Sequence, residues 1–418
     1  MLHGKRILLA AVPLFMLSAC SVMPTWIDPT TWWEDEEEVD VQILAPIKAQ
    51  FEPQIQWDAS LGDGVKQFFS RLAPANAYNK VFAASRQGEI IAFDAQSGEE
   101  VWSLDLAEYQ HEGFLSSITN LWADGISAKI SGGIVVSYDT VFLGTENGLV
   151  LAIDATTGEI KWQQKVRGEV LAPPMVDEGV VLVNTGSGIM HCLDAQSGEE
   201  RWVYESEVPP LSLRGISAPT ISAGAAIVGT ANGRLAAAVL ENGQLAWEQT
   251  IAAASGATEL ERLVDIDSEA LVLAGVVYTV SFNGTLAAVE LRTGRVIWKR
   301  EYRSYRRMSL EGNNLFVVDD NSQMYALDRR NGVELWTQTA LRGRDLTAAT
   351  AFKDYVVVGD KFGFLHWINQ TDGEIVARLE VGGDDEDEGI YAAPVVGGDM
   401  IYTQTRDGQL VAVSSPQP

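Results

Sequence analysis

The sequence has few of the side chains that most often carry out chemistry. Among its 418 residues are only two cysteines and four histidines: Cys20, Cys192, His3, His111, His191 and His366. His111-Glu112-Gly113 does not continue into a zinc-binding helix motif, and no phosphate-binding loop or nucleophile elbow occurs. Acidic residues are numerous enough that composition does not exclude a carboxylate pair. We nevertheless predict a protein without catalytic residues, bound metal or cofactor.

Basic residues and long apolar runs are also scarce. Lysine and arginine number 30 against 57 acidic residues, giving a net charge of −27, which argues against nucleic acid and against charge-driven binding to anionic lipid. The apolar run over residues 7–16 is too short for a permanent membrane-spanning helix. It follows Lys5 and Arg6, as in an export signal, which we expect to cover residues 1–19.

The predicted signal ends in Leu17-Ser18-Ala19-Cys20, which resembles the bacterial lipobox. The resemblance implies that Cys20 is lipidated and becomes the mature N-terminus, and Ser21 after it implies sorting to the outer membrane, facing the periplasm. Residues 20–50 carry prolines and the acidic run Glu34 to Glu38 without a sustained hydrophobic period, so they predict a flexible acidic tether. With Cys20 acylated, Cys192 is left without a disulfide partner, and we expect it to be a buried thiol.

Glycine and tryptophan, in contrast, recur at fixed spacing. A glycine lies fourteen residues before a tryptophan, with a second glycine four residues before it, in five copies: Gly88-Gly98-Trp102, Gly148-Gly158-Trp162, Gly188-Gly198-Trp202, Gly233-Gly243-Trp247 and Gly284-Gly294-Trp298. Ser322-Gly332-Trp336 lacks the first glycine, and Gly363-Gly373-Ala377 lacks the tryptophan. Such periodicity predicts a repeat architecture.

Each repeat is rich in short apolar segments separated by turn signals. Leu149–Asp154 is strand-like, Ala155–Gly158 is a turn, and Glu159–Trp162 begins another strand. Two further apolar strands precede each module, so one repeat predicts a four-stranded antiparallel propeller blade. We therefore expect an all-β, eight-bladed β-propeller over residues 51–418. The isolated Trp57 strand should complete the last blade, and the aligned tryptophans should fill the spaces between blades.

The sequence motif of the repeat resembles that of pyrroloquinoline-quinone dehydrogenases, which are eight-bladed propellers. Ala92–Trp102, Ala152–Trp162 and, with one departure, Leu193–Trp202 carry it. The resemblance makes a quinoprotein dehydrogenase one alternative, although the adjacent cysteine pair often found in those enzymes is missing here. Another alternative is a periplasmic polysaccharide-binding lipoprotein with an aromatic groove, for which Trp122 and Trp367 are the candidates because both lie off the repeat.

A broader resemblance covers nearly the whole chain. The lipobox, the tether, the segment Phe69–Ala75 and the eight repeats together resemble the BamB family of outer-membrane protein assembly factors, lipoprotein subunits of the β-barrel assembly machinery. This implies a non-catalytic scaffold that binds the POTRA domains of the barrel subunit BamA, alongside other lipoproteins of the complex, and acts in the insertion of β-barrel proteins. Unfolded outer-membrane protein clients are a further candidate partner. The most specific segments are Pro210–Gly215 and Arg262–Asp267, and the contact residues that the resemblance implies are Leu211, Leu213, Arg214, Asp265 and Asp267.

The positions of these residues within the repeats agree with that implication. Arg214 follows Trp202 by twelve residues and Asp265 follows Trp247 by eighteen, so both segments connect the last strand of one blade to the first of the next. Such connections in neighbouring blades emerge on the same face. We expect Leu213 and Asp265 to be neighbours, and the two leucines to form an apolar anchor with a charged rim. In the alternative arrangement, the leucines pack the loop down and Arg214 pairs internally with Asp265 or Asp267.

Overall fold

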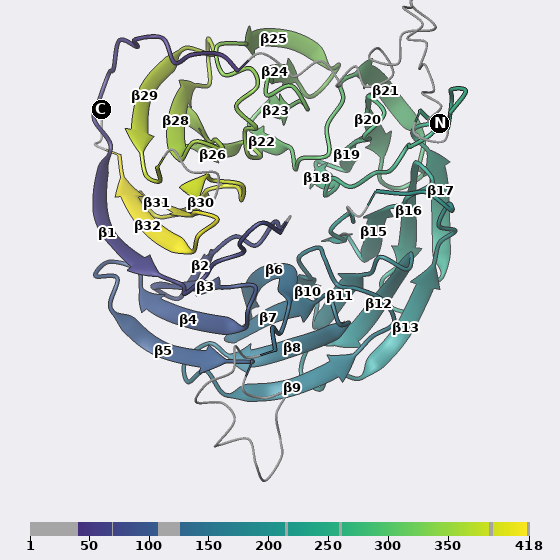
Figure 1. Cartoon of the computed structure of the whole chain (residues 1–418). Coiled ribbons are helices and arrows are strands. Elements are labelled where there is room, and N and C mark those ends of the chain that lie inside the picture. The colour runs from purple at the N-terminus through teal and green to yellow at the C-terminus, as the bar shows by residue number, and fades with distance from the viewer. Residues whose placement is uncertain are drawn as a thin grey trace, which may run out of the picture. The chain divides into compact units, whose positions relative to one another are not determined.

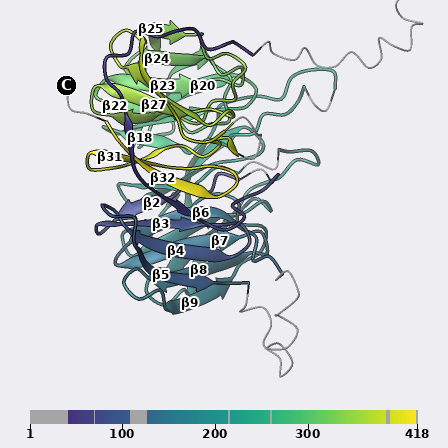
Figure 2. The same ribbon diagram turned by 60° about the vertical axis from the view of Figure 1, so that its left-hand side comes forward.

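Eight four-stranded antiparallel sheets make up the fold. The computed structural model describes residues 41–68, 70–107, 126–213, 216–258, 261–383 and 388–415, which contain 32 strands and no α-helix. Figure 1 shows the sheets as blades arranged around a centre, with the first strand of each blade innermost. In the turned view of Figure 2, β2–β5 lie beside β6–β9 as adjacent blades. The predicted all-β, eight-bladed propeller is confirmed. Within these residues no helix is long and apolar enough to cross a membrane.

The first four blades follow one another along the chain. Their strands are, in blade 1, β2 (Ala75–Ala77), β3 (Lys80–Ala84), β4 (Glu89–Asp94) and β5 (Glu100–Asp105); in blade 2, β6 (Ile130–Ser137), β7 (Thr140–Thr145), β8 (Leu149–Asp154) and β9 (Ile160–Lys165); in blade 3, β10 (Met175–Asp177), β11 (Val180–Asn184), β12 (Ile189–Asp194) and β13 (Glu200–Glu205); in blade 4, β14 (Thr220–Ser222), β15 (Ala225–Gly229), β16 (Arg234–Val239) and β17 (Leu245–Thr250).

The remaining blades repeat this order, except that the eighth takes its outer strand from the start of the fold. Their strands are, in blade 5, β18 (Leu271–Leu273), β19 (Val276–Val280), β20 (Thr285–Glu290) and β21 (Val296–Glu301); in blade 6, β22 (Ser309–Glu311), β23 (Asn314–Val318), β24 (Met324–Asp328) and β25 (Val333–Gln338); in blade 7, β26 (Thr350–Phe352), β27 (Tyr355–Gly359), β28 (Phe364–Asn369) and β29 (Ile375–Glu380); in blade 8, β30 (Val395–Gly397), β31 (Met400–Gln404), β32 (Gln409–Ser414) and β1 (Gln54–Ser60).

The hydrophobic pattern of each strand follows from its place in the blade. In β8, the four residues from Val150 to Ile153 are all buried, because the middle strands are covered on both faces by neighbouring blades. The outer strand β9 instead alternates, and its one buried residue is Trp162. Between them Asp154 Oδ1 accepts the amide hydrogens of Thr156 and Thr157, at 2.8 and 3.0 Å, which fixes the turn.

The ring closes as the sequence predicts. β1 pairs antiparallel with β32 in the eighth sheet, and Trp57 lies opposite Ala412. Strands from the two ends of the described chain therefore share one blade, so the outer edge of β32 is paired rather than open.

The glycine and the tryptophan of the repeat form a contact between successive blades. Trp102 of blade 1 donates its indole N–H to the carbonyl of Ala155 in blade 2, at 3.2 Å. A Cβ added to Gly158, in the same turn, would lie 2.8 Å from the Trp102 ring. The same two contacts join Trp57 to Gly98, Trp162 to Gly198, Trp202 to Gly243, Trp247 to Gly294, Trp298 to Gly332 and Trp336 to Gly373, each with its own indole hydrogen bond. The predicted interblade role of the tryptophans is confirmed.

The compact unit of the fold begins at Val41, ten residues before the expected start of the propeller. Residues 41–50, which we expected in the tether, contact the blades: the Gln42 amide donates to the Arg342 carbonyl at 3.0 Å, and the Gln50 amide to the Val376 carbonyl at 2.8 Å. Leu44 of the same stretch and the adjacent Phe51 pack against apolar clusters of the propeller. Residues 1–40, including the predicted signal and Cys20, lie outside the described residues.

Candidate functional site

Two loops of blades 3 to 5 carry the expected contact residues. Leu211 and Leu213 lie between β13 and β14, whereas Asp265 and Asp267 lie between β17 and β18. The Leu213 amide donates to Asp265 Oδ1 at 3.1 Å, so the loops adjoin as the repeat spacing predicts. Arg214 lies outside the described residues.

The side chains of the two loops differ sharply in exposure. Leu211 is 42% exposed and Leu213 is half-buried, while Asp265 and Asp267 are only 1% and 3% exposed. The expected charged rim therefore needs correction, because neither carboxylate is at the surface. The aspartates lie beneath the leucine loop, where Asp265 holds its backbone through the Leu213 amide.

Arg71 supports the second loop through its backbone. It belongs to the segment between β1 and β2, and its two Nη atoms donate to the carbonyls of Asp267 (2.9 Å) and Tyr305 (3.0 Å). One guanidinium thus bridges the connections that lead into blades 5 and 6. Sequence reasoning had singled out the segment Phe69–Ala75 without assigning Arg71 a role. Nothing in its local pattern indicates contacts with residues 196 and 234 positions away.

Burial shifts the protonation of both aspartates. Desolvation, with a smaller contribution from the charge of Asp267, raises the pKa of Asp265 to about 7, although the hydrogen bond from Leu213 opposes the shift. Desolvation also raises the pKa of Asp267 to about 6, and the charge of Arg71 opposes it. The buried Oδ2 of Asp265 has no hydrogen-bond partner among the described residues, an environment that favours the neutral acid.

Asp265→Asn should make folding stability less dependent on pH. Because the pKa of Asp265 is raised in the folded state, that state retains a proton which the unfolded chain releases above about pH 4. Stability from this group is therefore fully present below about pH 4, falls by up to about 1.4 kcal/mol per pH unit as pH rises toward 7, and is lost above that pH. Urea unfolding at pH 5 and pH 8 should show a smaller difference for Asp265→Asn than for the wild type.

The exposed Asp399, which is paired with Lys353, supplies the control. Asp399→Asn should leave the wild-type pH dependence in place. An Asp265→Asn protein with the same pH dependence as the wild type would contradict the assignment of this titration to Asp265.

Two cavities border the leucine loop. One, of about 380 Å³, is lined by Tyr204, Val208, Leu213 and Asp267 among others. The other, of about 320 Å³, is lined by Arg71, Leu213, Phe282 and Tyr305 among others. Leu213 is common to both, so its side chain lies between hollows rather than within a filled core.

Residues that bear on the alternative functions lie elsewhere. Trp367 is completely buried, so it lines no aromatic groove, and Trp122 lies outside the described residues. Cys192 is buried, and desolvation raises the pKa of its thiol to about 11, as expected for an inert thiol. No group of three or more histidine, cysteine or acidic residues suited to a metal occurs in the described part of the chain.

Sequence comparison places these loops in a family context. The family described as outer membrane protein assembly factor BamB matches residues 49–118, 86–338 and 332–416. Relatives of the same description include one from Alteromonas naphthalenivorans, 51% identical over 96% of this chain and 94% of its own length. Another, from Escherichia coli K12, is 41% identical over 98% of this chain and 99% of its own length.

Solved structures share the fold. The crystal structure of BamB from Moraxella catarrhalis superposes with a TM-score of 0.74 at 25% identity, covering 87% of this chain and 99% of that one. A quinohemoprotein alcohol dehydrogenase from Comamonas testosteroni has a TM-score of 0.65 at 13% identity, covering 87% of this chain and 76% of that one, a likeness that extends to the fold alone. By its match to the family over nearly its whole length, the chain belongs to the outer membrane protein assembly factor BamB family.

Proposed function

We propose that this protein is a non-catalytic scaffold lipoprotein of the outer-membrane β-barrel assembly complex, anchored through Cys20 and facing the periplasm. Its partner is a BamA-like barrel subunit, bound through the POTRA domains, and its role is to assist the insertion of β-barrel proteins. Family membership supports the assembly role and the association with the outer membrane. The resemblance to the BamB family implies the partner and its contact surface, and the geometry of the two loops supports Leu211 as the contact residue.

The main observation behind the proposal is an exposed apolar side chain on a loop whose backbone is held by a hydrogen bond. Leu211 is 42% exposed, while its neighbour Leu213 is held by Asp265 through a backbone hydrogen bond. Because the backbone next to it is already fixed, an exposed Leu211 would lose little conformational freedom when a partner binds, and a small entropic cost favours affinity. Arg214, adjacent in sequence, would add the charged contact that the buried aspartates do not provide.

Arg71 has a positioning role in this proposal. It does not reach the partner, but its hydrogen bonds to the Asp267 and Tyr305 carbonyls hold the loop beneath Leu213. Asp265 acts in the same way, through the Leu213 backbone. The two aspartates are therefore proposed to shape the binding loop and not to pair with charges of the partner.

Leu211→Asp should abolish recovery of the barrel subunit when the protein is purified from detergent-solubilised envelopes. A charge at an apolar hot spot costs roughly 2 kcal/mol or more of binding free energy, a thirtyfold loss of affinity. Arg214→Glu should have a similar effect. The matched control is Tyr138→Asp, since Tyr138 is 53% exposed on the β6–β7 turn, outside the site. Undiminished recovery of the partner by both site variants would refute the assignment.

A further inference from the structure

The seventh blade departs from the tryptophan pattern in a specific way. In blade 6, one row across the second, third and fourth strands reads Phe316, Ala326 and Trp336. In blade 7, the corresponding row reads Val357, Trp367 and Ala377. The indole has thus moved inward by one strand and exchanged places with the small residue. Trp367 is completely buried, and its Nε1 has no hydrogen-bond partner among the described residues.

The next blade explains why an outer indole would be unsupported here. In the other blades, the indole of the preceding blade lies on the turn between the third and fourth strands, which supplies a glycine and a carbonyl acceptor. In blade 8 those strands are β32 and β1, which are far apart in sequence and therefore share no turn. The junction between blades 7 and 8 consequently lacks both halves of the contact.

Residues 41–53, which we call the lead segment, reach this junction at their C-terminal end. Phe51 lies 5.1 Å from Tyr355 and 6.2 Å from Trp367 between ring centroids, edge-on to the indole. It packs against a cluster that joins the two blades through Ala377 and Val413. The hydrogen bond from Gln50 to Val376 fixes the backbone beside β29, and Figure 1 shows the purple lead segment passing outside β29 before it enters β1.

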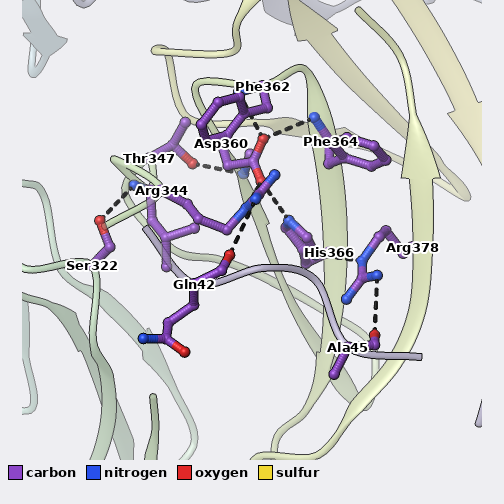
Figure 3. Close-up of polar contacts among 12 residues, drawn as sticks. Gln42, Ala45, Ser322, Arg344, Thr347, Asp360, Phe362, Phe364, His366 and Arg378 are labelled. Carbon is purple, nitrogen blue, oxygen red and sulfur yellow. Dashed lines mark hydrogen bonds and ion pairs between the residues drawn. The ribbon is translucent and has the colours of Figure 1, made fainter. Parts of the chain in front are cut away.

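The other end of the lead segment is attached at the junction of blades 6 and 7. Leu44 packs against the cluster that contains Trp336 and Ile368, and the Gln42 amide donates to the Arg342 carbonyl. Arg344 and Arg378 add longer contacts of 3.5 Å to the carbonyls of Gln42 and Ala45. Figure 3 shows that both guanidinium groups belong to a polar cluster centred on the buried Asp360 and His366.

We propose that the lead segment stabilises the junction between blades 7 and 8, with Phe51 in place of the missing interblade tryptophan. We call this role of the segment the fastener. Because its other end is attached beside Arg342, the same segment fixes the point at which the preceding chain leaves the propeller. The contacts of Gln42, Leu44, Gln50 and Phe51 with the blades are sufficient for this role, which does not depend on the proposed function.

One consequence rests on the proposed function, namely on lipidation at Cys20. Because residues 41–53 contact the blades, only residues 21–40 of the sequence lie between the predicted lipidation site and the propeller. Fully extended, these residues reach roughly 70 Å at about 3.5 Å per residue. The fastener therefore limits how far the Leu211 loop can be from the membrane.

Residue-resolved hydrogen exchange on the full-length protein tests the fastener. In the wild type, the Gln42 and Gln50 amides should exchange more slowly than their exposed neighbours in the same segment. In Phe51→Ala, the β29 and β1 amides should exchange at least roughly tenfold faster, while those of blades 2 to 4 keep their wild-type rates. Gln50→Pro, which removes the donor to Val376 and keeps Phe51, should have the same local effect.

Ile43→Ala is the matched control, because Ile43 lies in the same segment and is 92% exposed. Unchanged exchange of β29 in both Phe51→Ala and Gln50→Pro, or equal acceleration in all blades, would overturn the proposal. Partner recovery separates the two proposals: with the fastener weakened, Phe51→Ala should still recover the barrel subunit, whereas Leu211→Asp should lose it with normal β29 exchange.

Discussion

Gly158→Ala is expected to lower the free energy of unfolding by about 2–4 kcal/mol. Gly158 has φ of +77°, a conformation that costs a residue with a Cβ about 1 kcal/mol or more. The new Cβ would also lie 2.8 Å from the Trp102 ring, so the interblade contact must open, at a further cost of about 1–3 kcal/mol. Chemical denaturation followed by tryptophan fluorescence measures the sum.

Gly179→Ala separates the two contributions. Gly179 has nearly the same φ, +75°, but a Cβ there would meet nothing within 4 Å. Its replacement should therefore cost only the conformational part. Equal losses in the two variants would show that the glycine of the repeat is required for its backbone conformation alone, and not for the contact with the preceding tryptophan.

Asp360→Ala is expected to cost about 3–5 kcal/mol, because it leaves a buried guanidinium without its counter-charge. Asp360 Oδ2 accepts from Arg344 Nε at 2.6 Å and from His366 Nε2 at 2.8 Å, and all three residues are buried. Arg378 Nε donates to His366 Nδ1, so the imidazole proton is on Nε2. Burial alone would raise the pKa of Asp360, but His366 and Arg344 lower it overall, so the carboxylate is charged.

The exposed Asp372, which caps the β28–β29 turn through the Glu374 amide, provides the comparison. Asp372→Ala should cost no more than about 1 kcal/mol. If Asp360→Ala unfolded at the same denaturant concentration as Asp372→Ala, the polar cluster of Figure 3 would not be a structural element of blade 7.

The propeller was predictable because its signals are local and repeated. Each copy contains its own turn and its own tryptophan, and the unpaired Trp57 strand could only complete the blade that lacked one. The loss of tryptophan at Ala377 was visible in the sequence, but its cause was not. It depends on Phe51, a residue 326 positions earlier in the chain, and on the exchange of places with Trp367.

The site was predictable in position but not in burial. The spacing of the two loops from Trp202 and Trp247 correctly predicted that Leu213 and Asp265 are neighbours. An aspartate in a loop between two blades is predicted to be exposed, because buried carboxylates are rare. Asp265 and Asp267 are buried nonetheless, and their partners come from distant parts of the chain: the Leu213 amide for the Asp265 carboxylate and Arg71 for the Asp267 carbonyl.

The central claim, that the Leu211 loop is the surface which binds the barrel subunit, is tested most directly by photo-crosslinking in intact cells. A photoreactive amino acid at position 211 should give a crosslink to the POTRA region of the BamA-like subunit, and one at the exposed position 138 should not. A crosslink from position 138 with none from position 211 would contradict the account.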